Sequence, residues 1–225
     1  MQAVEHAVIA AAGLGSRLGH GLPKCMLELG GQTLLSRLIG TLEEHVDRIH
    51  VVVGYREELI INLCSKLHRR VVIVRNPDYR TTNTVQSMAL GAQGLEGKTL
   101  FLDGDLIIAP DSMREFIGKA GTTGILAAIA PSLSENPVNV DLDQGETSQG
   151  EKLIKSFTRE PGRKFEWANV VAGPARMLDN ATGYVYEKLE ESIPLNAAVL
   201  DLREIDTAAD LEIAREFVKS IDSSR

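Results

Sequence analysis

The chain has 225 residues, of which 44% are hydrophobic and 24% are charged, and this composition excludes a disordered or fibrous protein. The net charge of −7 excludes a broad nucleic-acid-binding face, because such a face needs a basic stripe that displaces counterions. The two cysteines form no Cys-x-x-Cys pair and no apolar run approaches the roughly 20 residues that span a bilayer, so the sequence predicts a cytoplasmic protein without a structural zinc site or membrane contact.

Short apolar runs alternate with amphipathic stretches through the first 130 residues. In chain order, the pattern predicts a strand at Ala7–Ala12, a helix at Leu34–Leu42, a strand at Ile49–Val53, a helix at Glu57–Leu67, a strand at Val71–Val74, a helix at Val85–Ala92, a strand at Thr99–Leu102, a helix at Met113–Ala120 and a strand at Gly124–Ala130. Strands that are apolar on both faces and separated by helices indicate a parallel sheet covered on both sides. We therefore expect a Rossmann-like α/β fold with an open, mainly parallel sheet sandwiched by helices.

The second half of the chain is less regular. Asn, Asp, Gln, Gly and Ser dominate Ser134–Glu151, which we expect to be an exposed loop. Strands are predicted at Lys152–Thr158, Phe165–Val171 and Val199–Arg203, and helices at Pro174–Glu191 and Thr207–Ser220. We expect residues 1–225 to form one domain, with an acceptor-binding elaboration at approximately residues 131–175.

The segment AAGLGSRLG, Ala11–Gly19, directly follows the first predicted strand. Ligands of open α/β sheets bind beyond the carboxyl ends of the strands, so this loop occupies the expected position of a site. Gly13 and Gly15 allow backbone amides to approach phosphates, and Arg17 and Lys24 add positive charge. Neither the G-x-G-x-x-G nor the G-x-x-x-x-G-K-[ST] spacing is present. The alternative is a tight turn in which the glycines serve backbone geometry alone.

Carboxylates follow two other predicted strands. Asp103 and Asp105 belong to the segment FLDGDLII, and Asp206 precedes the last predicted helix. Magnesium prefers one or two carboxylates together with substrate phosphates, so Asp105 and Asp206 are candidate ligands. The alternatives are that DGD only turns the chain and that Asp206 only stabilises the helix dipole.

These motifs resemble the signature of the nucleotidyltransferase superfamily of sugar-phosphate pyrophosphorylases and cytidylyltransferases. The resemblance rests on A-A-G-x-G-S-R followed by P-K and G-x-x-L-L, and it covers nearly the whole chain because DGD and EIDTAADL follow in the expected order. It implies that Ala12, Gly13, Gly15, Ser16 and Arg17 embrace a nucleoside triphosphate. Further implied roles are contact of Lys24 with oxygens of the α-phosphate, a nucleotide-facing or acceptor-facing position for Asp103, and a Mg²⁺ site at Asp105 and Asp206.

The segment Val74–Gly91 bears on the choice of nucleotide. It resembles the N-P…N-x-x-x-S segment of the branch that uses CTP with phosphocholine, aminoethylphosphonate or inositol phosphate, more than the Q-x-G-T-A segment of sugar nucleotidyltransferases. The matching positions, Asn83 and Ser87, are candidates for contact with the base or the ribose, and Tyr79, Thr84 and Gln86 are further candidates. Asn83 can also cap the helix that follows it.

The acceptor site is less defined by the sequence. Glu166 and Trp167 are the candidate acceptor-binding residues, because Trp167 is the only tryptophan and an aromatic wall would attract a cationic acceptor. Core packing is the alternative for Trp167. With 4% aromatic residues, the sequence favours a small phosphonate or another phosphorylated metabolite over phosphocholine.

The function predicted from these residues is Mg²⁺-dependent transfer of CMP from CTP to a small phosphorylated or phosphonate acceptor, with release of pyrophosphate. One alternative is a sugar-1-phosphate nucleotidyltransferase that uses UTP or dTTP, and transfer to a molybdenum cofactor is a more distant one. A non-catalytic nucleotide-binding regulatory module is the alternative from another class. The sequence does not decide whether the protein acts as a monomer or as a homodimer.

Overall fold

The computed structural model describes residues 3–13, 21–143 and 152–223. The strands of this part of the chain are β1 (Val4–Ala11), β2 (Glu28–Leu29), β3 (Gln32–Thr33), β4 (Arg48–Val53), β5 (Val71–Arg75), β6 (Lys98–Asp103), β7 (Leu106–Ile108), β8 (Leu126–Pro131), β9 (Asn139–Leu142), β10 (Lys152–Thr158), β11 (Phe165–Pro174), β12 (Leu195–Val199) and β13 (Leu202–Glu204). The helices are the 3₁₀ turn η2 (Lys24–Met26) and α1 (Leu34–Leu42), α2 (Glu57–Leu67), α3 (Thr84–Gly91), α4 (Pro110–Ala120), α5 (Val185–Glu190) and α6 (Ala208–Ser223).

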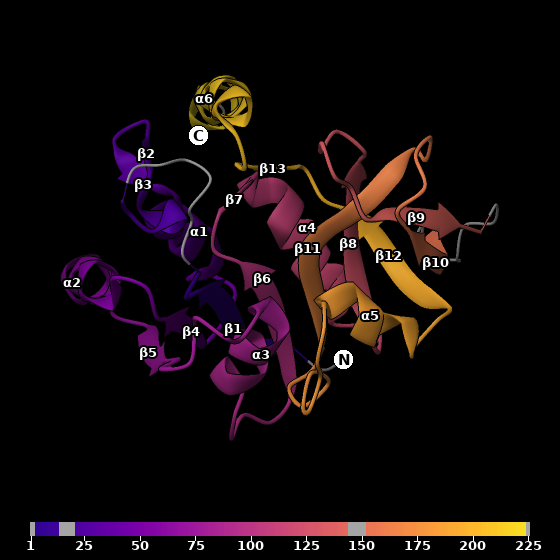
Figure 1. Cartoon of the computed structure of the whole chain (residues 1–225), viewed down its shortest axis with the longest axis horizontal. Helices are drawn as coiled ribbons and strands as arrows, with labels where there is room; N and C mark the ends of the chain where they lie inside the picture. The colour runs from indigo at the N-terminus through magenta and orange to yellow at the C-terminus, as the bar shows by residue number, and fades with distance from the viewer. Residues whose placement is uncertain (1–2, 14–20, 144–151, 224–225) are drawn as a thin grey trace.

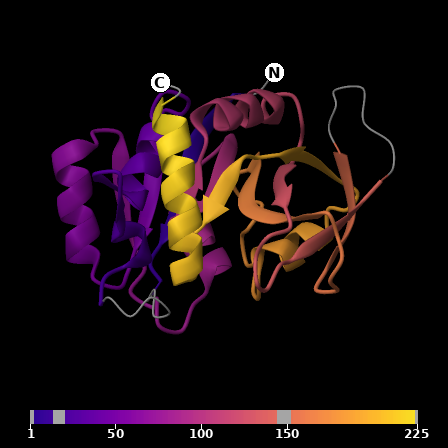
Figure 2. The ribbon, with the colours of Figure 1, turned by 90° about the horizontal axis from the view of Figure 1, so that it is seen from above.

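The described residues form a nine-stranded mixed sheet with the order β5-β4-β1-β6-β11-β8-β12-β10-β9 (Figure 1). Its first four strands are parallel, as expected for repeated βα units. From β11 onward the pairings are antiparallel except for β8 with β12. The prediction of a mainly parallel sheet therefore holds for the N-terminal half, and the whole sheet is mixed. Figure 2 shows the two halves side by side.

Helices cover both faces of the parallel half, because successive side chains of a strand point to opposite faces. Ala7 and Ile9 of β1 pack in a core with α1, α2 and α4, whereas Val8 between them packs in a second core with α3 and α5. Gly91 permits the close approach of α3, since a Cβ at this position would lie 2.5 Å from Cγ1 of Val8 and 2.6 Å from Cγ2 of Val52. The C-terminal end of α3 therefore packs directly on β1 and β4.

Three predicted elements of the second half are wrong in extent. The segment 134–151 contains strand β9 within the range predicted to be a loop, and β9 pairs with β10. The helix predicted at 174–191 is restricted to α5, because Asn180 and Gly183 adopt left-handed φ values of 57° and 79° that break a helix. The strand predicted at 199–203 divides into the end of β12 and β13.

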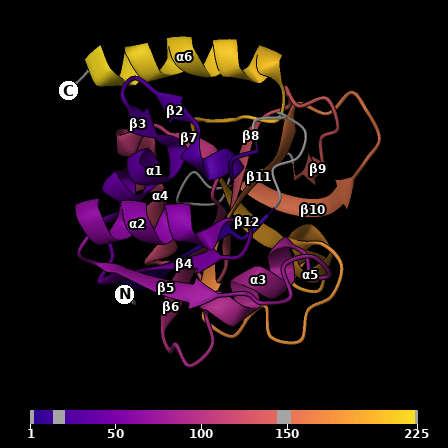
Figure 3. The same ribbon diagram turned by 60° about the vertical axis from the view of Figure 1, so that its left-hand side comes forward.

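Two small pairings bring the C-terminal segment to the end of the parallel strands. β13 pairs with β7, and Glu204 lies opposite Leu106. Helix α6 then packs against β7, α1 and the β2–β3 hairpin, beside which it lies in Figures 1 and 3. Buried Arg37 of α1 holds α6 through Asp222, with 2.7 Å between Nη1 and Oδ1. None of the helices in the described ranges combines the length and apolarity that crossing a bilayer requires.

Candidate active site

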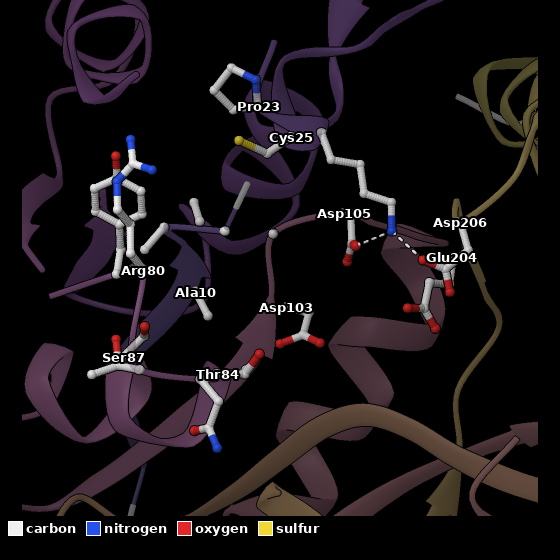
Figure 4. A pocket seen from close by; sticks show the side chains of 18 residues that line it. Ala10, Pro23, Cys25, Arg80, Thr84, Ser87, Asp103, Asp105, Glu204 and Asp206 are labelled. Carbon is white, nitrogen blue, oxygen red and sulfur yellow. Dashed lines mark hydrogen bonds and ion pairs between the residues drawn. The ribbon is translucent and has the colours of Figure 1, made fainter. Parts of the chain in front are cut away.

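A cavity of about 510 Å³ opens at the carboxyl ends of β1 and β6 (Figure 4). Its wall is built from the end of β1, η2, the segment that leads into α3, the turn after β6 and the segment after β13. The lining residues are Ala10, Ala11, Ala12, Gly13, Pro23, Lys24, Cys25, Tyr79, Arg80, Thr82, Asn83, Thr84, Ser87, Asp103, Gly104, Asp105, Glu204 and Asp206. The described start of the glycine-rich segment, Ala11–Gly13, therefore meets the DGD motif and the late aspartate in one cavity, although the three are far apart in sequence.

Three carboxylates converge on one side of this cavity. Asp105 follows β6, Glu204 ends β13, and Asp206 comes two residues later. One oxygen from each of the three lies within 4.8 Å of the others, and Figure 4 shows the side chains facing a common region. The antiparallel pairing of β13 with β7 produces this convergence, because it places the end of β13 beside the turn that carries Asp105.

Lys24 neutralises part of this charge. Its Nζ donates to Oδ2 of Asp105 and to Oδ1 of Asp206, at 2.6 Å in each case. Burial acts to lower the pKa of Lys24, but the charges of Asp105 and Asp206 and their hydrogen bonds outweigh it and hold the pKa above its ordinary value. The side chain is therefore an ammonium, held at the place where the carboxylates converge.

The remaining acids show that the cluster carries more negative charge than one lysine balances. Burial, followed by the charges of Asp105 and Asp206, raises the pKa of Glu204 to about 8. Burial and the charges of Asp105 and Glu204 raise the pKa of Asp103 well above its ordinary value. The Oδ1 atoms of Asp103 and Asp105 are buried without a hydrogen-bond partner among the described residues. Carboxylate oxygens with free lone pairs in this number fit a divalent cation such as Mg²⁺.

The segment before α3 forms the opposite wall. Asn83 caps α3 and forms a capping box with Gln86, which confirms the capping role considered from the sequence. Its Nδ2 also donates to the carbonyl of Gly183. Ser87 is buried, and its Oγ accepts from Nδ2 of Asn76 at 3.0 Å. Both predicted nucleotide contacts thus line the cavity, but their side chains are already bound to protein partners.

An aromatic surface lies next to this segment. Tyr79 packs against Gly54, where a Cβ would lie 2.6 Å from Cβ of Tyr79, so only glycine fits there. The guanidinium of Arg80 lies over the Tyr79 ring at 5.4 Å from its centroid. Both residues line the cavity together with Thr82. A base could stack here, and a phosphate could pair with Arg80.

The two predicted acceptor-binding residues are not brought into the cavity wall. Glu166 is buried, and its Oε1 accepts from the backbone amides of Leu133 and Ser134 at 3.3 Å. Trp167 packs edge-on against Phe157 in the second core, with ring centroids 6.3 Å apart. Trp167 therefore contributes to the packing of the C-terminal half of the sheet, Glu166 holds the backbone after β8, and acceptor binding by either residue stays a prediction.

Some predicted residues lie outside the described part of the chain, and other lining residues were not predicted. Gly15, Ser16 and Arg17 belong to residues 14–20, of which the structure gives no description. Glu204 was not predicted. Its signal was its spacing of two residues from Asp206, which places both side chains on the same side of an extended segment.

Comparison with known proteins identifies relatives of this arrangement. The family model described as MobA-like NTP transferase domain matches residues 7–180. The chain is 32% identical over 145 residues to the CMP-5'-(3-aminopropyl)phosphonate synthase of Streptomyces rubellomurinus, a match that covers 61% of this chain and 23% of that protein. It is 26% identical over 200 residues to the bifunctional protein GlmU of Methanococcus vannielii, covering 87% of this chain and 45% of that protein. The chain thus spans less than half of the length of these two relatives.

Two solved structures share the fold. The inositol-1-phosphate CTP transferase from T. maritima has a TM-score of 0.77 at 20% identity, and the match covers 98% of each chain. The CTP:phosphocholine cytidylyltransferase LicC from Streptococcus pneumoniae has a TM-score of 0.70 at 18% identity, with coverage of 97% of this chain and 100% of that one. At these identities the likeness concerns the fold alone.

Proposed function

The chain belongs to the family of MobA-like NTP transferase domains, and on this premise we propose that it transfers CMP from CTP to a small phosphorylated or phosphonate acceptor and releases pyrophosphate. Membership of the family confirms the resemblance found in the sequence and supports a nucleotidyl-transferring enzyme. The observation that carries the proposal is the convergence of Lys24 with Asp105, Glu204 and Asp206 beside the glycine-rich segment. The proposal treats residues 1–225 as one domain, with residues 131–175 as its acceptor-binding elaboration.

In this proposal Asp105, Asp206 and Glu204 hold a divalent cation, for which Mg²⁺ is the candidate. The separation of their oxygens and the unpartnered Oδ1 of Asp105 support this assignment. When bound, the cation supplies neutralisation of charge on the phosphates and on the leaving pyrophosphate. The three carboxylates would hold this cation. Asp103, half-buried in the same cavity wall, adds to the negative charge that Asp105 and Glu204 meet there.

Lys24 is proposed to act on the nucleotide. Its ammonium compensates Asp105 and Asp206 in the structure, and a cation bound by the carboxylates would take over that compensation and leave the ammonium for the α-phosphate. There it offsets the negative charge that develops as the acceptor oxygen attacks phosphorus. The new bond joins the acceptor oxygen to the α-phosphorus, and the bond from the α-phosphorus to the oxygen bridging to the β-phosphate breaks, so that pyrophosphate leaves with that electron pair.

The rest of the nucleotide is assigned to the opposite wall and to the glycine-rich segment. Ala12, Gly13, Gly15, Ser16 and Arg17 are proposed to bind the triphosphate through backbone amides and the guanidinium.

Base and ribose are proposed to lie along the wall between Tyr79 and Asn83. The side chains of Asn83 and Ser87 have protein partners, and these contacts hold the wall in place. Their remaining oxygen lone pairs are proposed to accept hydrogen bonds from the nucleotide. The likeness to the Streptomyces CMP-5'-(3-aminopropyl)phosphonate synthase supports cytidine as the base and a phosphonate as the acceptor.

A sugar-1-phosphate nucleotidyltransferase is the second candidate function, because the GlmU relative matches 87% of this chain. A panel of CTP, UTP, dTTP, GTP and ATP against phosphonates, choline phosphate, inositol phosphate and sugar 1-phosphates, with pyrophosphate release as the readout, separates the two. We expect release with CTP and a phosphonate or small phosphorylated acceptor. Release restricted to UTP or dTTP with a sugar 1-phosphate contradicts the cytidine assignment, and nucleotide binding without release favours a regulatory module.

A further inference from the structure

Strand β11 contains an irregularity next to the carboxylate cluster. Its pairing with β8 shifts register between Trp167 and Val171, which marks a bulge. Within this bulge Asn169 has a φ of 55°, in the left-handed region that side chains other than glycine rarely adopt. Such a conformation persists only where the surrounding structure determines it, and it is concentrated at functional sites.

The bulge turns the Asn169 side chain toward the site. Its Nδ2 donates to Oε2 of Glu204 at 3.1 Å, across 35 positions of sequence. In a regular strand the side chains alternate strictly between the two faces of the sheet. The bulge interrupts this alternation and changes the direction of the Asn169 side chain. Asn169 is thus a hydrogen-bond partner of the Glu204 carboxylate, while Asp105 and Asp206 are held by Lys24.

We propose that Asn169 is a positioning residue that orients the Glu204 carboxylate for binding of a divalent cation. A carboxylate that accepts one hydrogen bond on Oε2 leaves Oε1 and the second lone pair of Oε2 for the cation, in a fixed rotamer. Outer partners of metal ligands act in this way, and their loss typically lowers metal affinity about 10- to 100-fold. This inference rests on the metal site of the proposed function and adds a residue that acts through Glu204.

A purely structural role for Asn169 makes a different prediction. Asparagine tolerates the left-handed region better than most residues, so the bulge alone could require it. Glycine adopts this conformation without strain and cannot donate a side-chain hydrogen bond. Asn169→Gly therefore keeps the bulge and removes only the contact with Glu204. Asn180, with a φ of 57°, gives a matched control away from the cluster.

The test is titration of the full chain with Mn²⁺, with free Mn²⁺ followed by electron paramagnetic resonance, and thermal unfolding of each variant in parallel. We expect Asn169→Gly to weaken Mn²⁺ binding about tenfold or more while unfolding within a few degrees of the wild type. Asn180→Gly is expected to bind Mn²⁺ as the wild type does. In Glu204→Gln the affinity falls at least as far, and adding Asn169→Gly to it causes little further loss, because the two residues act as one unit.

The outcomes separate this inference from the proposed function. Wild-type affinity in Asn169→Gly, with weakened binding in Glu204→Gln, overturns the positioning role and leaves the metal site intact. Equal and additive losses from Asn169→Gly and Glu204→Gln also contradict it. If the wild type binds no more Mn²⁺ than Asp105→Asn, both the metal site and the role of Asn169 are refuted.

Discussion

Replacement of Lys24 by methionine probes the charge balance of the site before any substrate binds. The change keeps the length of the apolar stem and removes the ammonium that joins Asp105 and Asp206. Asp105 and Asp206 then lose the positive charge that compensates them, next to Glu204, whose oxygen lies within 4.8 Å of theirs. We expect the metal-free protein to be destabilised and a divalent cation to restore its stability.

The magnitude follows from the exposure of the three side chains. Removing one partner of a fully buried ion pair costs about 3–5 kcal/mol, and an exposed pair contributes about 1 kcal/mol or less. Lys24 and Asp105 are 15% and 19% exposed, whereas Asp206 is 36% exposed and partly screened by water. We therefore expect the free energy of unfolding to fall by about 2 kcal/mol, between these two limits. For a chain of this size such a loss lowers Tm by about 4–8 °C.

The assay is thermal unfolding of Lys24→Met and the wild type in EDTA and in millimolar Mg²⁺. We expect the difference in Tm to shrink in Mg²⁺, because the cation takes over the compensation of the carboxylates. Lys98→Met is the control, since the buried Lys98 donates to the carbonyls of Ala120 and Thr123 rather than to carboxylates. Its loss of stability should be the same in both solutions. A Lys24→Met protein that is as stable as the wild type in EDTA refutes this account of the cluster.

Two further predictions concern the wall of the cavity and the buried thiols. Asn83→Ala should lower the free energy of unfolding by about 1 kcal/mol and raise KM for the nucleotide, because it removes the cap of α3 and the tie to Gly183. Urea unfolding measures the loss of stability, and initial rates measure KM. The control Thr33→Ala, which removes the cap of α1, should lower the stability without changing KM. An unchanged KM in Asn83→Ala contradicts the nucleotide-binding role of this wall. Burial raises the pKa of Cys25 to about 12 and that of Cys64 to about 11, so at pH 8 the folded protein should not react with a disulfide reagent, whereas both thiols react in guanidinium. Rapid labelling of either thiol in the folded state contradicts the described packing.

The sequence predicted the parallel half of the fold because its local signals agree with the tertiary structure. The helices at Leu34–Leu42 and Glu57–Leu67 have the bounds that were predicted. The helices have one apolar face each, and the strands between them are apolar on both faces. Together these patterns indicate a sheet that is covered by helices on both faces. The ends of β1 and β6 then fix where Gly13 and Asp105 must lie.

The second half was harder to predict because its structure depends on pairing between distant segments. β12, with the sequence LNAAV, has two alanines and no clear alternation, and it is a strand because β8 and β10 flank it. The segment 175–184 has helical composition but is interrupted where Asn180 and Gly183 turn the chain.

The same limit applies to the site residues. Lys24, Asp105 and Asp206 follow from motifs, and the structure brings them into contact. The role of Glu204 depends on the pairing of β13 with β7, which only its two-residue spacing from Asp206 indicated. The contact of Asn169 depends on a bulge, which leaves no periodic signal in the sequence. Glu166 and Trp167 were predicted from their chemistry alone. The cavity wall includes neither, because Glu166 is held by the backbone amides of Leu133 and Ser134 and Trp167 packs in the core.

The central claim is that the carboxylate cluster supports metal-dependent nucleotidyl transfer. The most direct measurement is the rate of pyrophosphate release from CTP and a phosphonate acceptor, with Mg²⁺ or EDTA, for the wild type and Asp105→Asn. We predict release by the wild type in Mg²⁺, none in EDTA, and a loss of about 10³-fold or more in Asp105→Asn, whose fold is retained. Release at the wild-type rate by Asp105→Asn, or release that persists in EDTA, contradicts the account.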